Sequence, residues 1–328
     1  MKIRALLLSV ALGAAFLVAP AQAATQLNVG VAYDIGGRGD KSFNDASAAG
    51  LDKAKKQFDF NVEAVVTDGT TADREKRIRS LIAKNCNPII AIGAGYAATL
   101  QALAVEYPNT QFAIINDASV AALNVTSVVF ANTEGAYLAG FSAAQVSKSG
   151  KVAMIANANQ ADMYKDGFSA GVFASKKKVI PIVKYVSGSY SVATNQVLDA
   201  GADVVFVATQ GSDSEVFKAI VSRNAKKKGS NIGLINIEPD QYITVTSTTK
   251  KFLFASVVKR VDKAIYDVIA LSTTKKQYLD ILDADAGIYG RRYGITGGGI
   301  EFTIRSKELA RMSDLINVAA ATAEKISA

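Results

Sequence analysis

Short, nearly continuous apolar runs alternate along the chain with segments whose apolar residues recur at helical spacing. Runs this short and rich in β-branched residues predict strands. The predicted strands cover residues 27–33, 61–67, 88–93, 111–116, 125–130, 151–156, 179–185, 203–208, 231–237 and 252–258. Strands that are apolar along their whole length are typical of parallel sheets with helices on both faces.

Amphipathic patterns between these runs predict helices. In the first of them Phe43, Gly50 and Phe58 share one face, whereas Lys53 and Lys55 lie on the other. Similar patterns predict helices over residues 74–84, 96–106, 135–147, 162–174, 214–226 and 260–272. Three short apolar segments at 279–283, 293–295 and 300–304 predict crossings or edge strands. The alternation of strands and helices predicts an α/β fold.

The length of the chain and a break in the pattern around residues 131–150 predict two lobes. Each is a doubly wound parallel sheet, and a ligand cleft is expected between them, because ligands bind outside the carboxyl ends of such strands. We expect the N-terminal lobe to hold residues 24–131 and about 256–295. The C-terminal lobe is expected to hold residues 132–255 and about 296–328.

The first residues have the features of a secretory signal peptide. Lys2 and Arg4 precede an almost wholly apolar run over residues 5–18, and residues 21–23 form an A-x-A cleavage site. The run is too short to span a membrane. The single cysteine, Cys86, is far from the cleavage point. We therefore expect a signal peptide over residues 1–23 and an exported protein, periplasmic or extracellular, without a lipid on an N-terminal cysteine.

Composition restricts the chemistry. The chain has no histidine, which removes the Ser-His-Asp triad and the usual zinc sites. The formal net charge is +8, but its lysine runs lack the interleaved aromatic residues of a nucleic-acid surface. The single cysteine cannot form an internal disulfide. We expect no enzymatic activity, no metal, no cofactor and no nucleic-acid partner.

A glycine-rich segment at residues 33–45, YDIGGRGDKSFND, connects the first predicted strand to the first helix. It is not a Walker loop, because Asp40 stands where a glycine must precede the lysine. It also lacks the third glycine of a dinucleotide loop, since Ser42 holds that place and offers a helix cap instead. Asp34 is either an ordinary strand end or an acceptor for ligand hydroxyl groups. Phe43 either packs in the core or presents its ring to a planar ligand.

The same segment resembles the D-x-G-x-x-D-K-S-F-N signature of the basic membrane protein family of ABC-transporter binding proteins, which includes purine nucleoside receptors. Further resemblances follow at residues 134–140, 166–171, 238–241, 256–262 and 293–300, so the likeness covers essentially the whole mature chain. It implies a type I periplasmic-binding-protein fold and an ABC permease as membrane partner. It also implies a nucleoside ligand, purine favoured, held by aromatic stacking and by carboxylates on its hydroxyl groups.

Carried over by position, the resemblance assigns ribose binding to Asp34 and base stacking to Phe43 and Phe206. It implies a backbone contact from Gly211 and a hydroxyl contact from Lys259. The chain departs from the family pattern at residues 208–215, where most glycines are missing, and at 238, where glutamate replaces aspartate. The expected ligand-binding residues are Asp34, Phe43, Asn44, Tyr96, Asp117, Phe206, Gly211, Glu238, Asp240 and Lys259.

The sequence thus predicts a monomeric, exported solute-binding protein that captures a nucleoside for an ABC importer. One alternative is a binder or sensor of another small hydroxylated ligand, such as a sugar. An enzyme that cleaves a glycosidic bond on the same scaffold ranks below both, because no acid–base pair is evident.

Overall fold

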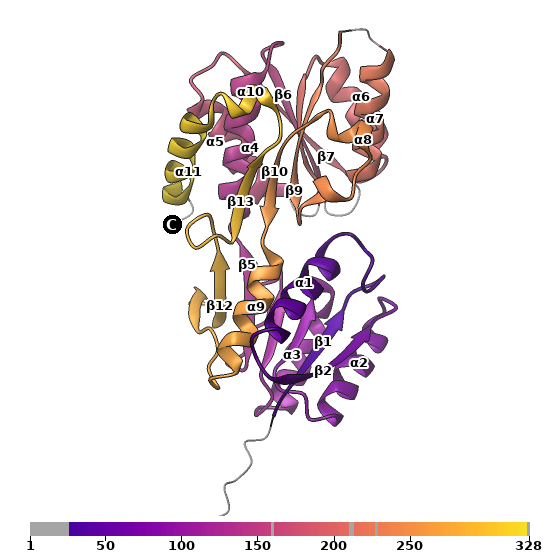
Figure 1. Ribbon diagram of the computed structural model, residues 1–328, viewed down its shortest axis with the longest axis vertical. Helices are drawn as coiled ribbons and strands as arrows, with labels where there is room; N and C mark the ends of the chain where they lie inside the picture. The colour runs from indigo at the N-terminus through magenta and orange to yellow at the C-terminus, as the bar shows by residue number, and fades with distance from the viewer. Residues whose placement is uncertain (1–25, 159–160, 210–212, 227–228, 327–328) are drawn as a thin grey trace, which may run out of the picture.

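The computed structural model describes residues 26–158, 161–209, 213–226 and 229–326, with the side chains of 161–163 left out. The predicted signal peptide lies outside the described residues. Two α/β lobes stand one above the other (Figure 1). Each lobe is built on one mostly parallel sheet with helices on both faces, as the continuous apolar runs predict. Among the described residues, no helix is long and apolar enough to cross a membrane.

The first lobe contains a seven-stranded sheet of order β11-β12-β5-β4-β3-β1-β2. Only the β11–β12 pair is antiparallel. Helices α1 and α9 cover one face, and α2 and α3 cover the other. The strands are β1 (Leu27–Tyr33), β2 (Phe60–Val66), β3 (Ile89–Ile92), β4 (Phe112–Ile115), β5 (Val125–Phe130), β11 (Asp280–Asp283) and β12 (Ile288–Tyr293). The helices are α1 (Phe43–Lys55), α2 (Thr71–Ala83), η1 (Ala94–Tyr96), α3 (Ala97–Glu106) and α9 (Val261–Ser272).

The second lobe contains a six-stranded sheet of order β13-β10-β9-β8-β6-β7, in which only β13 is antiparallel. Helices α4, α5, α10 and α11 lie on one face, and α6, α7 and α8 lie on the other. The strands are β6 (Lys151–Asn157), β7 (Ile180–Val186), β8 (Val204–Ala208), β9 (Gly233–Glu238), β10 (Leu253–Lys259) and β13 (Ile300–Ile304). The helices are α4 (Asn132–Val146), α5 (Ala161–Ala174), α6 (Tyr190–Asp199), α7 (Asp213–Lys226), η3 (Gln241–Ile243), α8 (Ser247–Lys250), α10 (Lys307–Ala310) and α11 (Ser313–Ile326).

The strands agree closely with the sequence prediction up to β10, whereas the C-terminal third differs more. Strand β12 covers Ile288–Tyr293, so the predicted segment 293–295 overlaps it only at Tyr293. The rest of the strand was not predicted because two arginines interrupt its apolar pattern. Helices α6, α8, α10 and α11 had no predicted counterpart. Strand β10 pairs within the second sheet as far as Lys259, so the chain passes to the first lobe a few residues beyond the expected boundary near 256.

Three chain passages connect the lobes, and backbone hydrogen bonds tie them together. The N–H of Ala131 donates to the carbonyl of Tyr293 at 2.9 Å, and the N–H of Arg260 donates to the carbonyl of Gly299 at 2.9 Å. The buried carboxylate of Glu134 accepts from the N–H of Ile295 at 2.7 Å. Residues 134–140 and 293–300, two of the family-like segments, therefore build the connection between the lobes.

A third family-like segment, residues 166–171, forms a close helix crossing. A Cβ at Gly171 of α5 would lie 2.0 Å from the carbonyl oxygen of Tyr137 in α4, and one at Gly140 of α4 would lie 2.1 Å from that of Phe168. No side chain fits at these distances. The two glycines are therefore required for α4 and α5 to pack backbone against backbone.

Candidate functional site

Two neighbouring hollows lie where the carboxyl ends of the two sheets face each other. The first has a volume of about 480 Å³ and is lined by the ends of β1, β3 and β4, by the start of α1 and by Glu238 of the second lobe. The second has a volume of about 520 Å³ and lies between residues 40–42 and the helices α7 and α8. Asp40 and Ser42 line both hollows. Each volume is in the range of small-molecule sites.

The loop between β1 and α1 is held rigidly by its own side chains. The carboxylate of Asp40 accepts hydrogen bonds from the backbone N–H groups of Ser42, Asn44 and Asp45 at 2.8–3.1 Å. Asp40 is therefore the cap of α1, and the hydroxyl of Ser42 makes no cap hydrogen bond. Ser42 holds the predicted N-cap position, but its side chain does not cap the helix, because the carboxylate two residues earlier reaches three donors at once. The carboxylate of Asp45 in turn accepts from the N–H groups of Gly39 and Lys41.

Asn44 fastens the helix to the tip of the strand. Its side-chain oxygen accepts from the N–H of Asp34 at 3.0 Å, and its amide nitrogen donates to the carbonyls of Asp34 and Ile35 at 3.3 Å. Asn44 lines the first hollow but is buried, with its polar atoms already engaged. Its geometry positions Asp34 and Phe43, the two residues on either side of it in the hollow.

The carboxylate of Asp34 is oriented by an arginine that the sequence did not reveal. Arg74 of α2 donates from Nη2 to Asp34 Oδ1 at 2.9 Å and from Nη1 to the carbonyl of Gly69. A Cβ at Gly95 would lie 2.5 Å from Arg74 Nη2, so this glycine leaves the space that the guanidinium occupies. In the sequence Arg74 is one charged residue on the polar face of a helix, and only the tertiary contact distinguishes it.

Of the other predicted residues of the first lobe, Phe43 lines the first hollow, whereas Tyr96 and Asp117 do not. The ring of Phe43 lines the hollow at the start of α1. Tyr96 is fully buried in the core on the α2 and α3 side of the sheet, and its hydroxyl donates to the carbonyl of Tyr33 at 2.8 Å. Asp117 accepts from the N–H and hydroxyl of Ser119, and its neighbour Asn116 lines the hollow instead.

Two of the predicted residues of the second lobe lie away from the first hollow. Phe206 is fully buried in β8, with its ring stacked on that of Phe168 at 5.6 Å between centroids. Asp240 caps η3 and accepts from Arg305 at 2.8 Å. Gly211 lies outside the described residues. A ring that was not predicted, Phe217 of α7, lines the second hollow.

Glu238 and Lys259 end the neighbouring strands β9 and β10 and are both 1 % exposed. The carboxyl oxygens of Glu238 have no hydrogen-bond partner among the described residues. Burial raises the pKa of Glu238 to about 8, and the carboxylates of Asp213 and Asp40 act in the same direction, against Lys259. The carboxyl group of Glu238 is therefore mostly protonated at neutral pH.

The ammonium group of Lys259 lies where the lobes meet. It is 3.1 Å from the hydroxyl of Tyr164 in the second lobe and 5.7 Å from the centre of the Phe43 ring in the first. This places a cation beside the aromatic face that lines the first hollow, an arrangement favoured by the electrostatics of aromatic rings.

A polar chain continues from Glu238 toward the second hollow. The buried carboxylate of Asp213 accepts from the hydroxyl of Thr209 and from the amide of Gln241. The amide of Asn236 lies 3.4 Å from the side-chain oxygen of Gln241. Burial raises the pKa of Asp213 above its ordinary value. The second lobe thus carries buried polar groups at its cleft end, which is where such sheets bind ligands.

Two α/β lobes, joined by three crossings and facing each other across a polar hollow, define the type I periplasmic-binding-protein fold. The fold resembles an ABC transporter solute-binding protein from Aeropyrum pernix K1, with a TM-score of 0.67 and 21% identity over 91% of this chain and 86% of that one. It also resembles a transcriptional activator of comK from Bacillus halodurans, with a TM-score of 0.69 and 20% identity over 90% and 97%.

The sequence profile of the PnrA-like ABC transporter substrate-binding proteins matches residues 27–325, so the chain belongs to this family. A nucleoside-binding protein of an ABC transporter from Lactococcus lactis is 26% identical over 74% of each chain. A CD4+ T-cell-stimulating antigen from Listeria innocua is 29% identical over 73% of this chain and 72% of its own. The family consists of binding proteins rather than enzymes, and it implies a small-molecule ligand and an ABC permease as partner.

Proposed function

We propose that this protein captures a nucleoside, purine favoured, between its lobes and delivers it to an ABC permease. The observation that carries the proposal is that Asp34, Phe43 and Glu238 line the same hollow. A carboxylate, an aromatic face and a protonated carboxyl group supply the three kinds of contact that a nucleoside needs.

Asp34 is proposed to hold the ribose. An ionised carboxylate accepts two hydroxyl hydrogen bonds, as the vicinal hydroxyls of ribose require. Arg74 donates a hydrogen bond to Asp34 Oδ1 and so fixes the plane of the carboxylate, while Oδ2 lies toward Gly93. The side chain of Asp34 is 37% exposed, so it remains accessible to a ligand.

The base is proposed to lie on Phe43, beside the carboxyl group of Glu238. A protonated carboxyl group both donates and accepts a hydrogen bond, which suits the paired donor and acceptor edge of a purine. Lys259 is close enough to Phe43 to contact a ligand stacked there. For the second ring we favour Phe217 over Phe206: both side chains are buried, but Phe217 lines a hollow shared by both lobes and Phe206 does not.

We further propose that the protein is exported through the signal peptide at residues 1–23 and acts as a monomer. Cys86 is the only cysteine and is buried within the first lobe, so it is not available to carry a lipid. One relative, from Pyrococcus abyssi, is described as an uncharacterized lipoprotein and is 24% identical over 89% of this chain and 75% of its own. Mass spectrometry of the mature N-terminus distinguishes cleavage after residue 23 from lipid attachment.

The experiment is calorimetry and thermal unfolding with a panel of nucleosides, free bases, pentoses and hexoses. A ligand at a hundredfold excess over its dissociation constant adds about 2.7 kcal/mol to the free energy of unfolding. Asp34→Asn keeps the shape of the side chain and removes its charge, and we expect it to abolish nucleoside binding. Asp52→Asn is the matched control. Asp52 lies on α1 in an exposed ion pair with Arg38 of the preceding loop, so its substitution should leave binding unchanged.

A second candidate ligand is a pentose or hexose. It is favoured by one observation: among the described residues that line the first hollow, Phe43 is the only aromatic one. A sugar needs one apolar face beneath it, whereas a sandwiched base needs two. If sugars shift the unfolding curve and nucleosides do not, the sugar is the ligand and the purine proposal is wrong.

A further inference from the structure

A third recess lies at the opposite end of the first lobe, where its parallel strands begin. This basal groove has a volume of about 880 Å³ and is lined by the start of β1, the α2–β3 and α3–β4 connections and the turn after α9. Representative lining residues are Asn28, Asn85, Asn87, Gln111 and Lys276. It is larger than either hollow between the lobes and lies within the size range of ligand pockets.

The chemistry of the basal groove is unusually uniform. Of its thirteen described lining residues, seven carry a carboxamide, three are lysines and none carries a carboxylate. Carboxamides offer both donors and acceptors, as sugar hydroxyls do. Lysines add positive charge. The lining therefore fits a ligand with many hydroxyl groups and a negative charge.

Hydrogen bonds to the backbone hold several of these carboxamides in place. The amide nitrogen of Asn28 donates to the carbonyl of Lys84 at 2.8 Å, and that of Gln277 donates to the carbonyl of Leu123 at 2.8 Å. The side-chain oxygen of Asn87 accepts from the N–H of Gln111 at 2.9 Å. The groove is thus preorganised, so little conformational entropy is lost when a ligand binds.

Three acceptors at the groove lack donors. The side-chain oxygens of Asn28, Gln111 and Gln277 are buried and have no hydrogen-bond partner among the described residues. Leaving such an acceptor unsatisfied is unfavourable. These three oxygens are enclosed by the protein, so the groups open to a ligand are the exposed ones of the lining, such as those of Asn85, Asn87 and Lys276.

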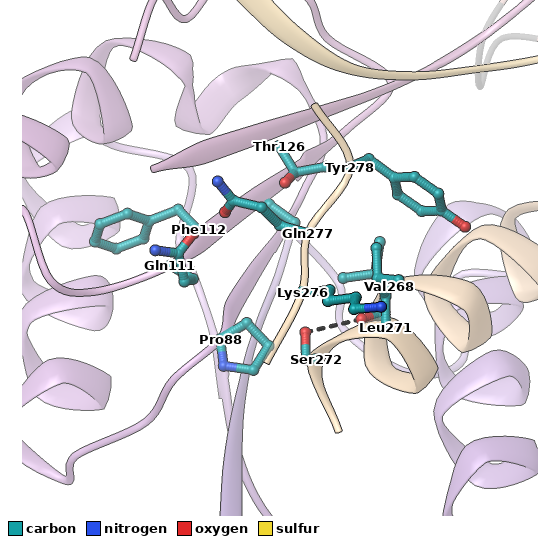
Figure 2. A pocket seen from close by; sticks show the side chains of 11 residues that line it. Pro88, Gln111, Phe112, Thr126, Val268, Leu271, Ser272, Lys276, Gln277 and Tyr278 are labelled. Atoms are coloured by element: carbon teal, nitrogen blue, oxygen red, sulfur yellow. Dashed lines mark hydrogen bonds between the residues drawn. The ribbon is translucent and has the colours of Figure 1, made fainter. Parts of the chain in front are cut away.

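A small cavity of about 20 Å³ extends the groove inward. It shares Pro88, Gln111, Ser272, Lys276 and Gln277 with the groove and continues to the apolar side chains below the sheet. Figure 2 shows both glutamines among the side chains around it, with the hydroxyl of Ser272 bonded to the carbonyl of Val268. The cavity is large enough for one water molecule.

Positive charge is held at the rim by the turn that ends α9. Lys275 has a left-handed backbone, with φ of 55°, and its N–H donates to the carbonyl of Ser272 at 2.9 Å. The N–H of Lys276 donates to the carbonyl of Leu271 at 3.2 Å. Lys84 is already paired with Glu63 at 2.6 Å, whereas Lys275 and Lys276 have no ion pair among the described residues. Two ammonium groups are therefore available for an anionic group.

We propose that the basal groove is a second ligand site, specific for a polyhydroxylated anion of sugar size. Sugar acids and sugar phosphates share this chemistry. The site is separate from the hollow between the lobes, since it lies at the amino ends of the strands of the first lobe and the hollow lies at their carboxyl ends.

The test is calorimetric titration of the full mature chain with glucuronate, glucose 6-phosphate, glucose and inorganic phosphate. We expect saturable binding of glucuronate, of glucose 6-phosphate or of both. The compound that binds shows whether the site accepts a carboxylate, a phosphate or either. Glucose and inorganic phosphate are expected to bind at least about tenfold more weakly. Glucose lacks the negative charge that the lysines attract, and phosphate lacks the sugar hydroxyl groups that the carboxamides bind. Equal affinity for inorganic phosphate and the sugar anions would overturn the proposal.

Charge reversal at Lys275 and Lys276, written K275E/K276E, is expected to raise the dissociation constant of the sugar anion at least about tenfold. The matched control is K176E/K177E after α5, where an exposed lysine with φ of 55° is also followed by a second lysine. Asn85 has φ of 57°, so Asn85→Gly removes a rim carboxamide without backbone strain and is expected to weaken binding about threefold.

Two further outcomes contradict the basal site. Equal weakening by K275E/K276E and K176E/K177E means that net charge alone attracts the ligand. Loss of sugar-anion binding in Asp34→Asn means that the ligand occupies the hollow between the lobes. Retained binding in Asp34→Asn, together with lost nucleoside binding in the same variant, supports two independent sites.

Discussion

The ionisation of Glu238 should make the stability of this protein fall as pH rises. Its carboxyl group is fully buried, lacks a hydrogen-bond partner among the described residues and has a pKa of about 8 against an ordinary value of 4.5. A carboxyl group whose pKa is raised by folding contributes its full stability below pH 4.5 and loses it as pH rises through about 8. The relevant window is therefore pH 4.5 to 8.

The size of the effect follows from the same two values. Each pH unit in the window lowers the free energy of unfolding by about 1.4 kcal/mol, so the total loss is about 5 kcal/mol above pH 8 and about 3 kcal/mol at pH 7. Glu238→Gln keeps the size of the side chain and cannot ionise. We expect similar stabilities of the two proteins at pH 5 and a variant that is more stable by about 4 kcal/mol at pH 8.

The measurement is urea unfolding of the ligand-free protein at half-unit steps from pH 5 to 8.5, followed by circular dichroism. Glu308→Gln on α10 is the control, because Glu308 is an exposed glutamate and its removal should leave the pH dependence unchanged. Parallel pH profiles for the natural protein and Glu238→Gln would refute the assignment of a protonated carboxyl group at the cleft.

Three further predictions test other parts of the structure. Gly95→Ala displaces the Arg74 guanidinium and should raise the dissociation constant of the proposed nucleoside ligand about tenfold in calorimetry. Asp40→Ala removes the acceptor of three N–H groups and should cost about 1–2 kcal/mol in urea unfolding, whereas Ser42→Ala should change the free energy by less than about 0.5 kcal/mol. Gly171→Ala forces α4 and α5 apart and should cost about 3 kcal/mol in the same assay.

Gly188→Ala is the control for both glycine substitutions. An added Cβ there meets nothing within 4 Å, so neither stability nor affinity should change. A Gly171→Ala protein as stable as Gly188→Ala would contradict the close crossing of α4 and α5. Equal effects of Asp40→Ala and Ser42→Ala would contradict the assignment of Asp40 as the cap.

Most of the architecture was predictable from the chain itself. Ten predicted strands match strands of the two sheets, because continuous apolar runs between amphipathic segments have few other folded arrangements. The prediction was weaker for α6 and α11. No helix was predicted for either segment, although both have a helical apolar period that is clear in α11.

The candidate site was predictable in its first lobe and less so in its second. Asp34, Phe43 and Asn44 lie on one continuous segment, so local sequence determines that they occupy one loop. Arg74 comes from another helix, and no local pattern marks it. Phe206 and Phe217 are both buried phenylalanines, and only the packing of α7 places Phe217 at the wall of a hollow.

The sequence by itself therefore determined the order of strands and helices, the two-lobe organisation and the loop that opens the first helix. These depend on apolar periodicity and on contacts between near neighbours. The tertiary structure decided which side chains meet at the cleft, the protonation of Glu238 and the existence of the basal groove. Each of these depends on burial and on distances between segments far apart in the chain, which become defined only when the sheets pack.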